Sequence, residues 1–157
     1  MQHRTLGKTG YYASEIGFGA WGIGGSMWQG SDDKTSLAAL EAALDAGLDF
    51  IDTALAYGDG HSERLVSRAI HRQADAVTIA TKIPPKNLEW PARRGIPLGK
   101  VFPASWVRSR AHRSARNLGR PVDLLQFHVW RDEWLLAEER PRVEETMRAL
   151  TAEGTVR

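Results

Sequence analysis

The 157-residue sequence contains no cysteine, which excludes disulfides and thiolate metal sites, and no metal site of another kind is predicted. It has no apolar run near the ~20 residues that a membrane-spanning helix needs. The N-terminal MQHRTLGKTG is polar and lacks the apolar core of a signal peptide. A formal net charge of +2 is too small to indicate a nucleic-acid or membrane partner. We therefore expect a cytoplasmic protein that binds neither.

The chain alternates between strand and helix patterns. Residues 17–25 are expected to form a short strand that runs into a glycine-rich loop. Further strands are expected at 48–54, 76–83 and 122–130, and helices at 32–47, 61–73, 105–119 and 141–154. Such alternation is typical of a parallel sheet with helices packed outside it, and right-handed connections can coil the units into a barrel or an open sheet.

The length of the chain limits how much of a barrel it can form. An eight-stranded (β/α)8 barrel of the TIM type takes about 250 residues. We therefore expect only the first four βα units, over residues 17–157, preceded by a β-hairpin over residues 1–16. The whole of residues 1–157 would be a partial barrel domain, and the final Thr-Val-Arg would begin a further strand. Residues 84–103 are expected to form a long loop without periodicity of its own.

The segment GFGAWG (17–22) fits the dinucleotide fingerprint G-x-G-x-x-G. In that fingerprint the glycines open a helix whose N-terminus holds a pyrophosphate. Here the next expected helix begins some ten residues later. We interpret the segment as a loop that approaches another part of the chain or a ligand closely, and not as a Rossmann site.

Three of the expected strands end in an ionisable residue: Asp52, Lys82 and His128. In a parallel barrel the carboxyl ends of all strands face one rim, where the active site lies. The three side chains are therefore expected to meet, with Tyr57 folding over the same point. Lys82 would be buried beside Asp52, because each charge would be costly to bury alone.

These four residues together favour a chemical role. The Lys82 ammonium would lower the pKa of Tyr57, so that its phenol could protonate a carbonyl oxygen. His128 would donate a hydrogen bond to that oxygen, and a nicotinamide cofactor would have to supply hydride. Taken singly, each residue has a structural explanation: an ion pair, a core histidine, or loop packing.

Five segments resemble the aldo-keto reductase superfamily, in the same order and spacing: HRTLGKTG, GFGAWGIGG, DFIDTALAYGDGHSERL, IATKI and DLLQFHVW. The resemblance implies a (β/α)8 barrel whose N-terminal end is plugged by a hairpin. It also implies reduction of small aldehydes and ketones to alcohols, usually with NADPH, although NADH is not excluded. The catalytic tetrad of the family falls on Asp52, Tyr57, Lys82 and His128.

The resemblance also assigns part of a cofactor site. Gly19, Ala20 and Trp21, together with Asp52, would lie near the nicotinamide. The other cofactor residues of the family come from the second half of the barrel, which this sequence does not contain. We therefore expect the isolated chain to bind cofactor weakly and to turn over little. The alternative is a non-catalytic binding or assembly module, similar to channel-associated subunits, that self-associates through open sheet edges.

Several aromatic and basic residues could either bind a ligand or have a purely structural role. Tyr57, His128, Trp21 and Trp130 are candidates for substrate binding, and both tryptophans could equally be ordinary packing. Trp28 and Trp90 are expected to pack. Residues 86–120 hold nine Lys or Arg and one acid. We interpret the helical arginines in this run as a solvated outer surface and not as a nucleic-acid groove. Arg93 and Arg94 could instead contact an anionic substrate or cofactor.

Overall fold

The computed structural model describes residues 1–25 and 32–157, so Trp28 lies outside the described residues. The strands are β1 His3–Thr5, β2 Tyr12–Ser14, β3 Phe18–Gly19, β4 Phe50–Asp52, β5 Thr78–Ile83 and β6 Leu124–Phe127. The α-helices are α1 Asp33–Asp45, α2 His61–Ile70, α3 Leu98–Val101, α4 Ala104–Leu118 and α5 Arg140–Ala152. Short 3-10 turns are η1 Gly22–Gly24, η2 Ala74–Ala76 and η3 Asp132–Leu136.

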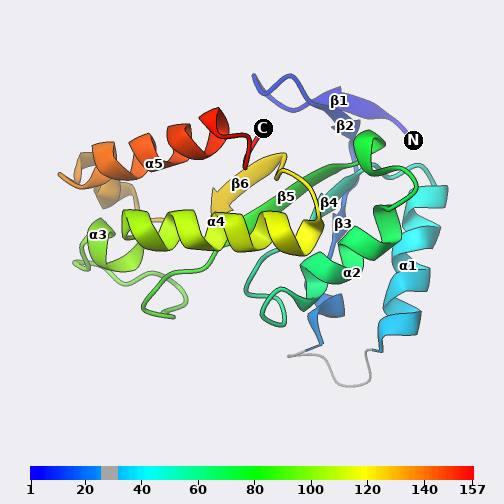
Figure 1. The fold of residues 1–157 in the computed structure, drawn as a ribbon, viewed down its shortest axis with the longest axis horizontal. Helices are drawn as coiled ribbons and strands as arrows, with labels where there is room; N and C mark the ends of the chain where they lie inside the picture. Colours follow the sequence, from blue (N-terminus) through cyan, green and yellow to red (C-terminus); the bar gives the residue numbers. More distant parts are fainter. Residues whose placement is uncertain (26–31) are drawn as a thin grey trace.

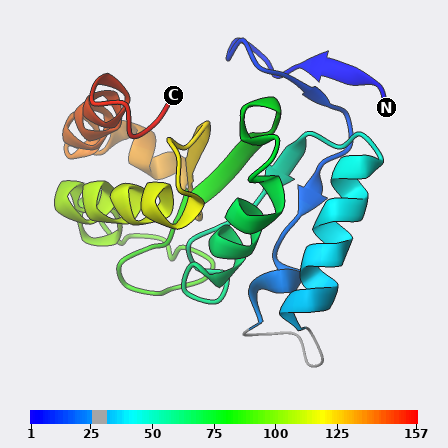
Figure 2. The same ribbon diagram turned by 45° about the vertical axis from the view of Figure 1, so that its right-hand side comes forward.

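Four parallel strands form the main sheet, in the order β3-β4-β5-β6. Each neighbour in the sheet is the next strand in the chain, as in a barrel that coils in one sense. The helices α1, α2, α4 and α5 pack against one another in chain order along the outside of the sheet (Figures 1 and 2). The predicted α/β architecture of a partial barrel is confirmed.

The predicted N-terminal hairpin also forms. Strands β1 and β2 pair antiparallel, with His3 opposite Ser14. The hairpin is fastened to the sheet through Asp49, whose carboxylate accepts hydrogen bonds from the Ser14 amide at 2.6 Å and contacts the His3 ring at 2.9 Å. Figure 1 shows the hairpin across the end of the sheet at which β4 and β5 begin.

The core lies between the helices and the outer face of the sheet. Residues alternate along the strands, so that Ile51 and Ile79 point to the helices and are 1% exposed. Val107, Ala111 and Leu118 of α4 are part of this core. Helix α1 begins where the Asp32 carboxylate accepts a hydrogen bond from the Thr35 amide at 2.9 Å.

Several element boundaries differ from expectation. Strand β4 has only three residues, and β6 ends at Phe127, so His128 follows its strand and donates its amide hydrogen bond to the Ile83 carbonyl at 3.0 Å. The loop expected over 84–103 includes the short helix α3. The final residues make a single parallel bridge, from Val156 to Val122. No helix within the described ranges combines the length and apolar character needed to cross a bilayer.

Candidate active site

The predicted pair of Lys82 and Asp52 forms at the carboxyl ends of β5 and β4. The Lys82 ammonium donates to the Asp52 carboxylate at 2.6 Å and to the Thr53 carbonyl at 2.9 Å. The Lys82 side chain is 16% exposed, but that of Asp52 is 41% exposed, so the predicted burial of Asp52 is wrong. Because neighbouring Ile51 takes the helix side of β4, Asp52 points to the opposite face, which is open.

Tyr57 and His128 meet above this pair. The Lys82 ammonium lies 5.5 Å from the centroid of the Tyr57 ring. The rings of Tyr57 and His128 are 5.5 Å apart in an edge-to-face arrangement. The turn that places Tyr57 holds Gly58, Asp59 and Gly60 in the left-handed region. The four predicted residues are thus brought together around Lys82.

The pKa of Tyr57 is raised and not lowered. Burial of the phenol is the larger cause, and the negative charge of Asp52 adds to it. The expectation that Lys82 would lower this pKa is therefore wrong. The ammonium faces the aromatic ring and is hydrogen-bonded to Asp52, so it does not hold the phenol oxygen as an ion-pair partner would. Tyr57 keeps its proton at neutral pH.

The pKa of His128 is lowered to about 4, first by burial and then by the positive charge of Lys82, with Asp52 opposing the shift. The imidazole is therefore neutral at pH 7 and carries one N–H donor. Its Nδ1 atom is buried and makes no hydrogen bond within the described part of the chain. The Trp90 ring lies against His128, with ring centroids 4.5 Å apart.

Tyr57 and His128 open into a pocket of about 730 Å³. Its wall is mostly aromatic and aliphatic, and its lining residues are Trp21, Leu55, Ala56, Tyr57, Asp59, Pro84, Leu88, Trp90, Trp106, Arg110 and His128. This size and composition suit a small organic ligand. Trp21 lines the pocket, in agreement with its predicted alternative as a substrate-binding residue. Trp90, expected only to pack, and Trp106, not singled out in the sequence, line it too.

Trp130 does not line this pocket. Its ring stacks on Phe127 at 5.7 Å and meets Trp134 edge-on at 5.5 Å, which is the packing alternative. Arg93 is also outside the pocket lining and pairs with Glu89 at 3.5 Å.

A buried network of polar side chains connects α2 to the segments that carry the site. The Ser62 hydroxyl donates to the Ala20 carbonyl at 2.7 Å and shares a 2.8 Å hydrogen bond with the Thr53 hydroxyl. The Ala20 amide donates to the Asp52 carbonyl at 2.8 Å. Glu63 is fully buried and accepts hydrogen bonds from Thr81 and Asn117, both at 2.7 Å. Sequence reasoning missed this network, although Ser62 and Glu63, in the first turn of an amphipathic helix, are a signal for it.

Comparison with known proteins identifies the family. A sequence profile described as "Aldo/keto reductase family" matches residues 15–157. The chain belongs to the aldo/keto reductase family. Aldo-keto reductase YhdN of Bacillus subtilis is 38% identical over 160 residues, which cover 100% of this chain and 45% of that protein. A probable voltage-gated potassium channel subunit beta of rice (Oryza sativa) is 34% identical over 87 residues, 53% of this chain and 25% of that one.

A solved structure supports the same family assignment. The aldo-keto reductase from Klebsiella pneumoniae in complex with NADPH superimposes with a TM-score of 0.68 at 28% identity, covering 94% of this chain and 44% of that one. This aldo/keto reductase chain therefore spans about half the length of the relatives that it matches.

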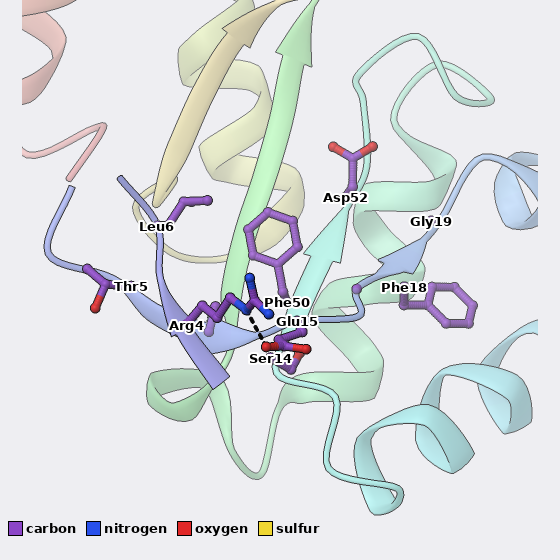
Figure 3. A pocket seen from close by; sticks show the side chains of 11 residues that line it. Arg4, Thr5, Leu6, Ser14, Glu15, Phe18, Gly19, Phe50 and Asp52 are labelled. Carbon is purple, nitrogen blue, oxygen red and sulfur yellow. Dashed lines mark hydrogen bonds and ion pairs between the residues drawn. The ribbon is translucent and has the colours of Figure 1, made fainter. Parts of the chain in front are cut away.

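The aldo/keto reductase chain has a second hollow, of about 630 Å³, on the face of the sheet away from the helices (Figure 3). It lies between the hairpin and the strands β3 and β4, and Gly19, Phe50 and Asp52 line it. In Figure 3 an ion pair between Arg4 and Glu15 lies at its hairpin side. Lys82 thus lies between the two cavities, because its partner Asp52 lines this hollow and the neighbouring Tyr57 lines the aromatic pocket.

The residues expected near a nicotinamide differ in how much of their surface a cofactor could reach. Gly19 and Asp52 border the open hollow, and Trp21 is 47% exposed beside the aromatic pocket. Ala20 is fully buried, and both its backbone groups are hydrogen-bonded within the chain. Ala20 therefore positions its neighbours and leaves no surface for a cofactor.

Proposed function

We propose that this segment supplies the proton-transfer site of an oxidoreductase that reduces aldehydes or ketones to alcohols, with Asp52, Tyr57, Lys82 and His128 as its catalytic residues. Family membership supports carbonyl reduction in general. The observation that carries the residue assignment is that Tyr57 and His128 meet in the lining of a 730 Å³ pocket, with the Lys82 ammonium 5.5 Å from the centroid of the Tyr57 ring.

In this proposal Tyr57 donates its phenolic proton to the carbonyl oxygen. The bond from the carbonyl oxygen to that proton forms as the carbonyl π bond and the phenolic O–H bond of Tyr57 break, which leaves Tyr57 as a phenolate. The raised pKa of Tyr57 keeps the proton donor loaded at neutral pH. Transfer remains favourable because the developing alkoxide is a stronger base than a phenolate.

His128 would orient the substrate. Its neutral imidazole has one N–H that can donate to the carbonyl oxygen, and its lowered pKa prevents it from competing with Tyr57 as the acid. Asp52 would hold Lys82 in place through their 2.6 Å hydrogen bond.

We propose NADPH as the reductant, which supplies hydride to the carbonyl carbon when bound. Support comes from the similar Klebsiella pneumoniae structure, which contains NADPH. Gly19, Trp21 and Asp52 would border the nicotinamide. We also propose that residues 1–157 act as a partial barrel domain, in which the hairpin of residues 1–16 precedes four βα units, and that the protein is cytoplasmic.

Substitution of Tyr57 tests the proposal, with activity measured on the complete gene product. Tyr57→Phe should lower kcat for an aldehyde roughly 10²–10⁴-fold, because general acid catalysis is lost. The Kd for NADPH should stay within about twofold, because the ring is retained. Tyr12→Phe is the matched control, since Tyr12 is 68% exposed on the hairpin. A Tyr57→Phe protein that reduces aldehydes at near wild-type rates would refute the assignment.

A second candidate is a binding or assembly module. The similarity to the rice channel subunit favours it, together with the open edges of the sheet at β3 and β6. Sedimentation of the 157-residue chain, beside an NADPH fluorescence titration, separates the two functions. A well-folded dimer that does not bind NADPH would support the assembly role.

A further inference from the structure

Among the described residues that line the aromatic pocket, Arg110 is the positively charged one; it lies within ion-pair distance of no carboxylate, although its charge helps to lower the pKa of Asp59. Arg110 and Asp59 both line the pocket, but the Asp59 carboxylate is bonded to Arg113 at 2.6 Å. Within the described residues, Arg110 makes no ion pair, and its Nε donates a hydrogen bond to the Ser109 hydroxyl at 3.2 Å. Tyr57 and His128 are neutral at pH 7. The unbalanced charge of the lining is therefore the guanidinium of Arg110.

The position of this guanidinium is fixed by stacking. It lies 4.3 Å from the centroid of the Trp106 ring, in a cation–π contact. The Trp106 indole is itself held by a 2.8 Å hydrogen bond from its Nε1 to the Pro84 carbonyl. A guanidinium that stacks through its face keeps its N–H edge for other partners, and that edge matches a carboxylate in a bidentate arrangement.

The expectation that the arginines of α4 form a solvated outer face fails at this residue. Arg108 points away from the pocket and pairs with Glu153, whereas Arg110 lies in the pocket wall. The pocket lining also includes the charged Asp59 and the apolar or aromatic residues Leu55, Leu88 and Trp90. The pocket therefore offers a proton donor, an aromatic wall and a cationic edge.

We propose that the preferred substrates of this site are carbonyl compounds that carry a carboxylate on an apolar, preferably aromatic body, and that Arg110 binds the carboxylate. This inference rests on the proposed function for the reaction of the carbonyl group. The recognition of the anion does not require turnover and can be measured separately.

Binding of two aldehydes to the 157-residue chain tests the proposal. The probes are 4-formylbenzoate and its neutral methyl ester, titrated against the indole N–H resonances of Trp21, Trp90 and Trp106 by NMR. The wild-type chain should bind the anion about tenfold more tightly than the ester, as for one charge-assisted hydrogen-bonded contact at a partly exposed position. Both probes should shift the same indole resonances.

Variants of two arginines on the same helix provide the contrast. Arg110→Met should abolish the preference for the anion while the affinity for the ester stays within about twofold. Arg110→Gln, a second variant, should do the same if Arg110→Met folds poorly. Arg108→Met should keep the full preference. Equal affinity of the wild-type chain for the two probes, no binding of either, or a preference that survives in both Arg110 variants would overturn the proposal.

The same variants separate this proposal from the proposed reaction. In the complete gene product, Arg110→Met should remove the preference in kcat/KM for the anionic aldehyde without lowering kcat for the ester. If the chain binds 4-formylbenzoate through Arg110 but the complete product does not reduce it, the anion site stands and the reductase assignment fails.

Discussion

Two acid–base pairs lie at opposite ends of the same parallel sheet. At the amino ends of the strands, Asp123 is 1% exposed and binds Arg120, Arg157 and the Ile79 amide, at 2.9, 3.1 and 2.9 Å. At the carboxyl ends, Asp52 is 41% exposed and binds Lys82 at 2.6 Å. Asp123 binds Arg120, three residues earlier in the chain, and the distant Arg157, whereas Asp52 and Lys82 lie on neighbouring strands and Asp52 lines a cavity.

The difference between the pairs separates structural from chemical roles. Asp123 receives hydrogen bonds on both oxygens, and Arg120 also donates to the Val77 carbonyl at 3.1 Å, so little capacity is left for a ligand. Asp52 and Lys82 leave part of their surface open, next to a phenol and a neutral imidazole. Incomplete pairing beside ionisable neighbours is typical of a functional site.

Removal of Asp123 should have the largest effect on stability. Asp123→Ala leaves Arg120, whose side chain is 9% exposed, without its carboxylate and the Ile79 amide without an acceptor. Breaking a buried pair in this way costs about 3–5 kcal/mol of unfolding free energy. Urea denaturation of the 157-residue chain measures it. A loss below about 1 kcal/mol would mean that the buried pair does not differ from a surface pair.

Acidification should have an intermediate effect on the stability of the folded chain, through protonation of His128. Its pKa is about 4 in the folded chain against an ordinary 6.5, so folding favours the neutral imidazole. This contribution to stability is fully present above pH 6.5 and is lost as the pH falls from 6.5 toward 4.

A variant isolates the part of that pH dependence that His128 causes. His128→Gln should show a shallower decline of the urea midpoint over this range than wild type. His71→Gln is the matched control, because His71 lies on the surface, where its ring contacts the Arg68 carbonyl at 2.9 Å, and its midpoint should decline as that of wild type does. Identical slopes for wild type and His128→Gln would contradict the lowered pKa.

Removal of Asp52 should have the smallest effect on stability. Because its side chain is 41% exposed and its partner Lys82 retains the Thr53 carbonyl, Asp52→Ala should cost at most about 1 kcal/mol. The same urea experiment measures it beside Asp123→Ala. A cost equal to that of Asp123→Ala would remove the distinction between the two pairs.

The sequence predicted the elements whose cause is local. Alternating strands and helices and the hairpin follow from periodicity and residue preference. The approach of Lys82 to Asp52 follows because parallel strands end at one edge.

Other features depend on distances that a pattern does not contain. Arg120 belongs to a run of basic residues in the sequence and gives no sign that it turns inward to Asp123. Arg110 was predicted to lie on a solvated surface, because the sequence does not show that Trp106, on the same helix, is held by the Pro84 carbonyl after β5 and stacks on Arg110. The direction of the Tyr57 pKa shift depends on the burial of the phenol and on the charge of Asp52. The spacing of the residues in the sequence does not show that these two effects outweigh the charge of Lys82.

The central claim is that Asp52, Lys82 and His128 share one electrostatic site, and titration of the His128 ring by NMR tests it most directly. Wild-type His128 should titrate near pH 4. Lys82→Met should raise that pKa, because a neighbouring positive charge is removed, and Asp52→Asn should lower it, because a negative one is removed. A wild-type pKa near 6.5, or one that neither substitution moves, would show that the three side chains do not meet.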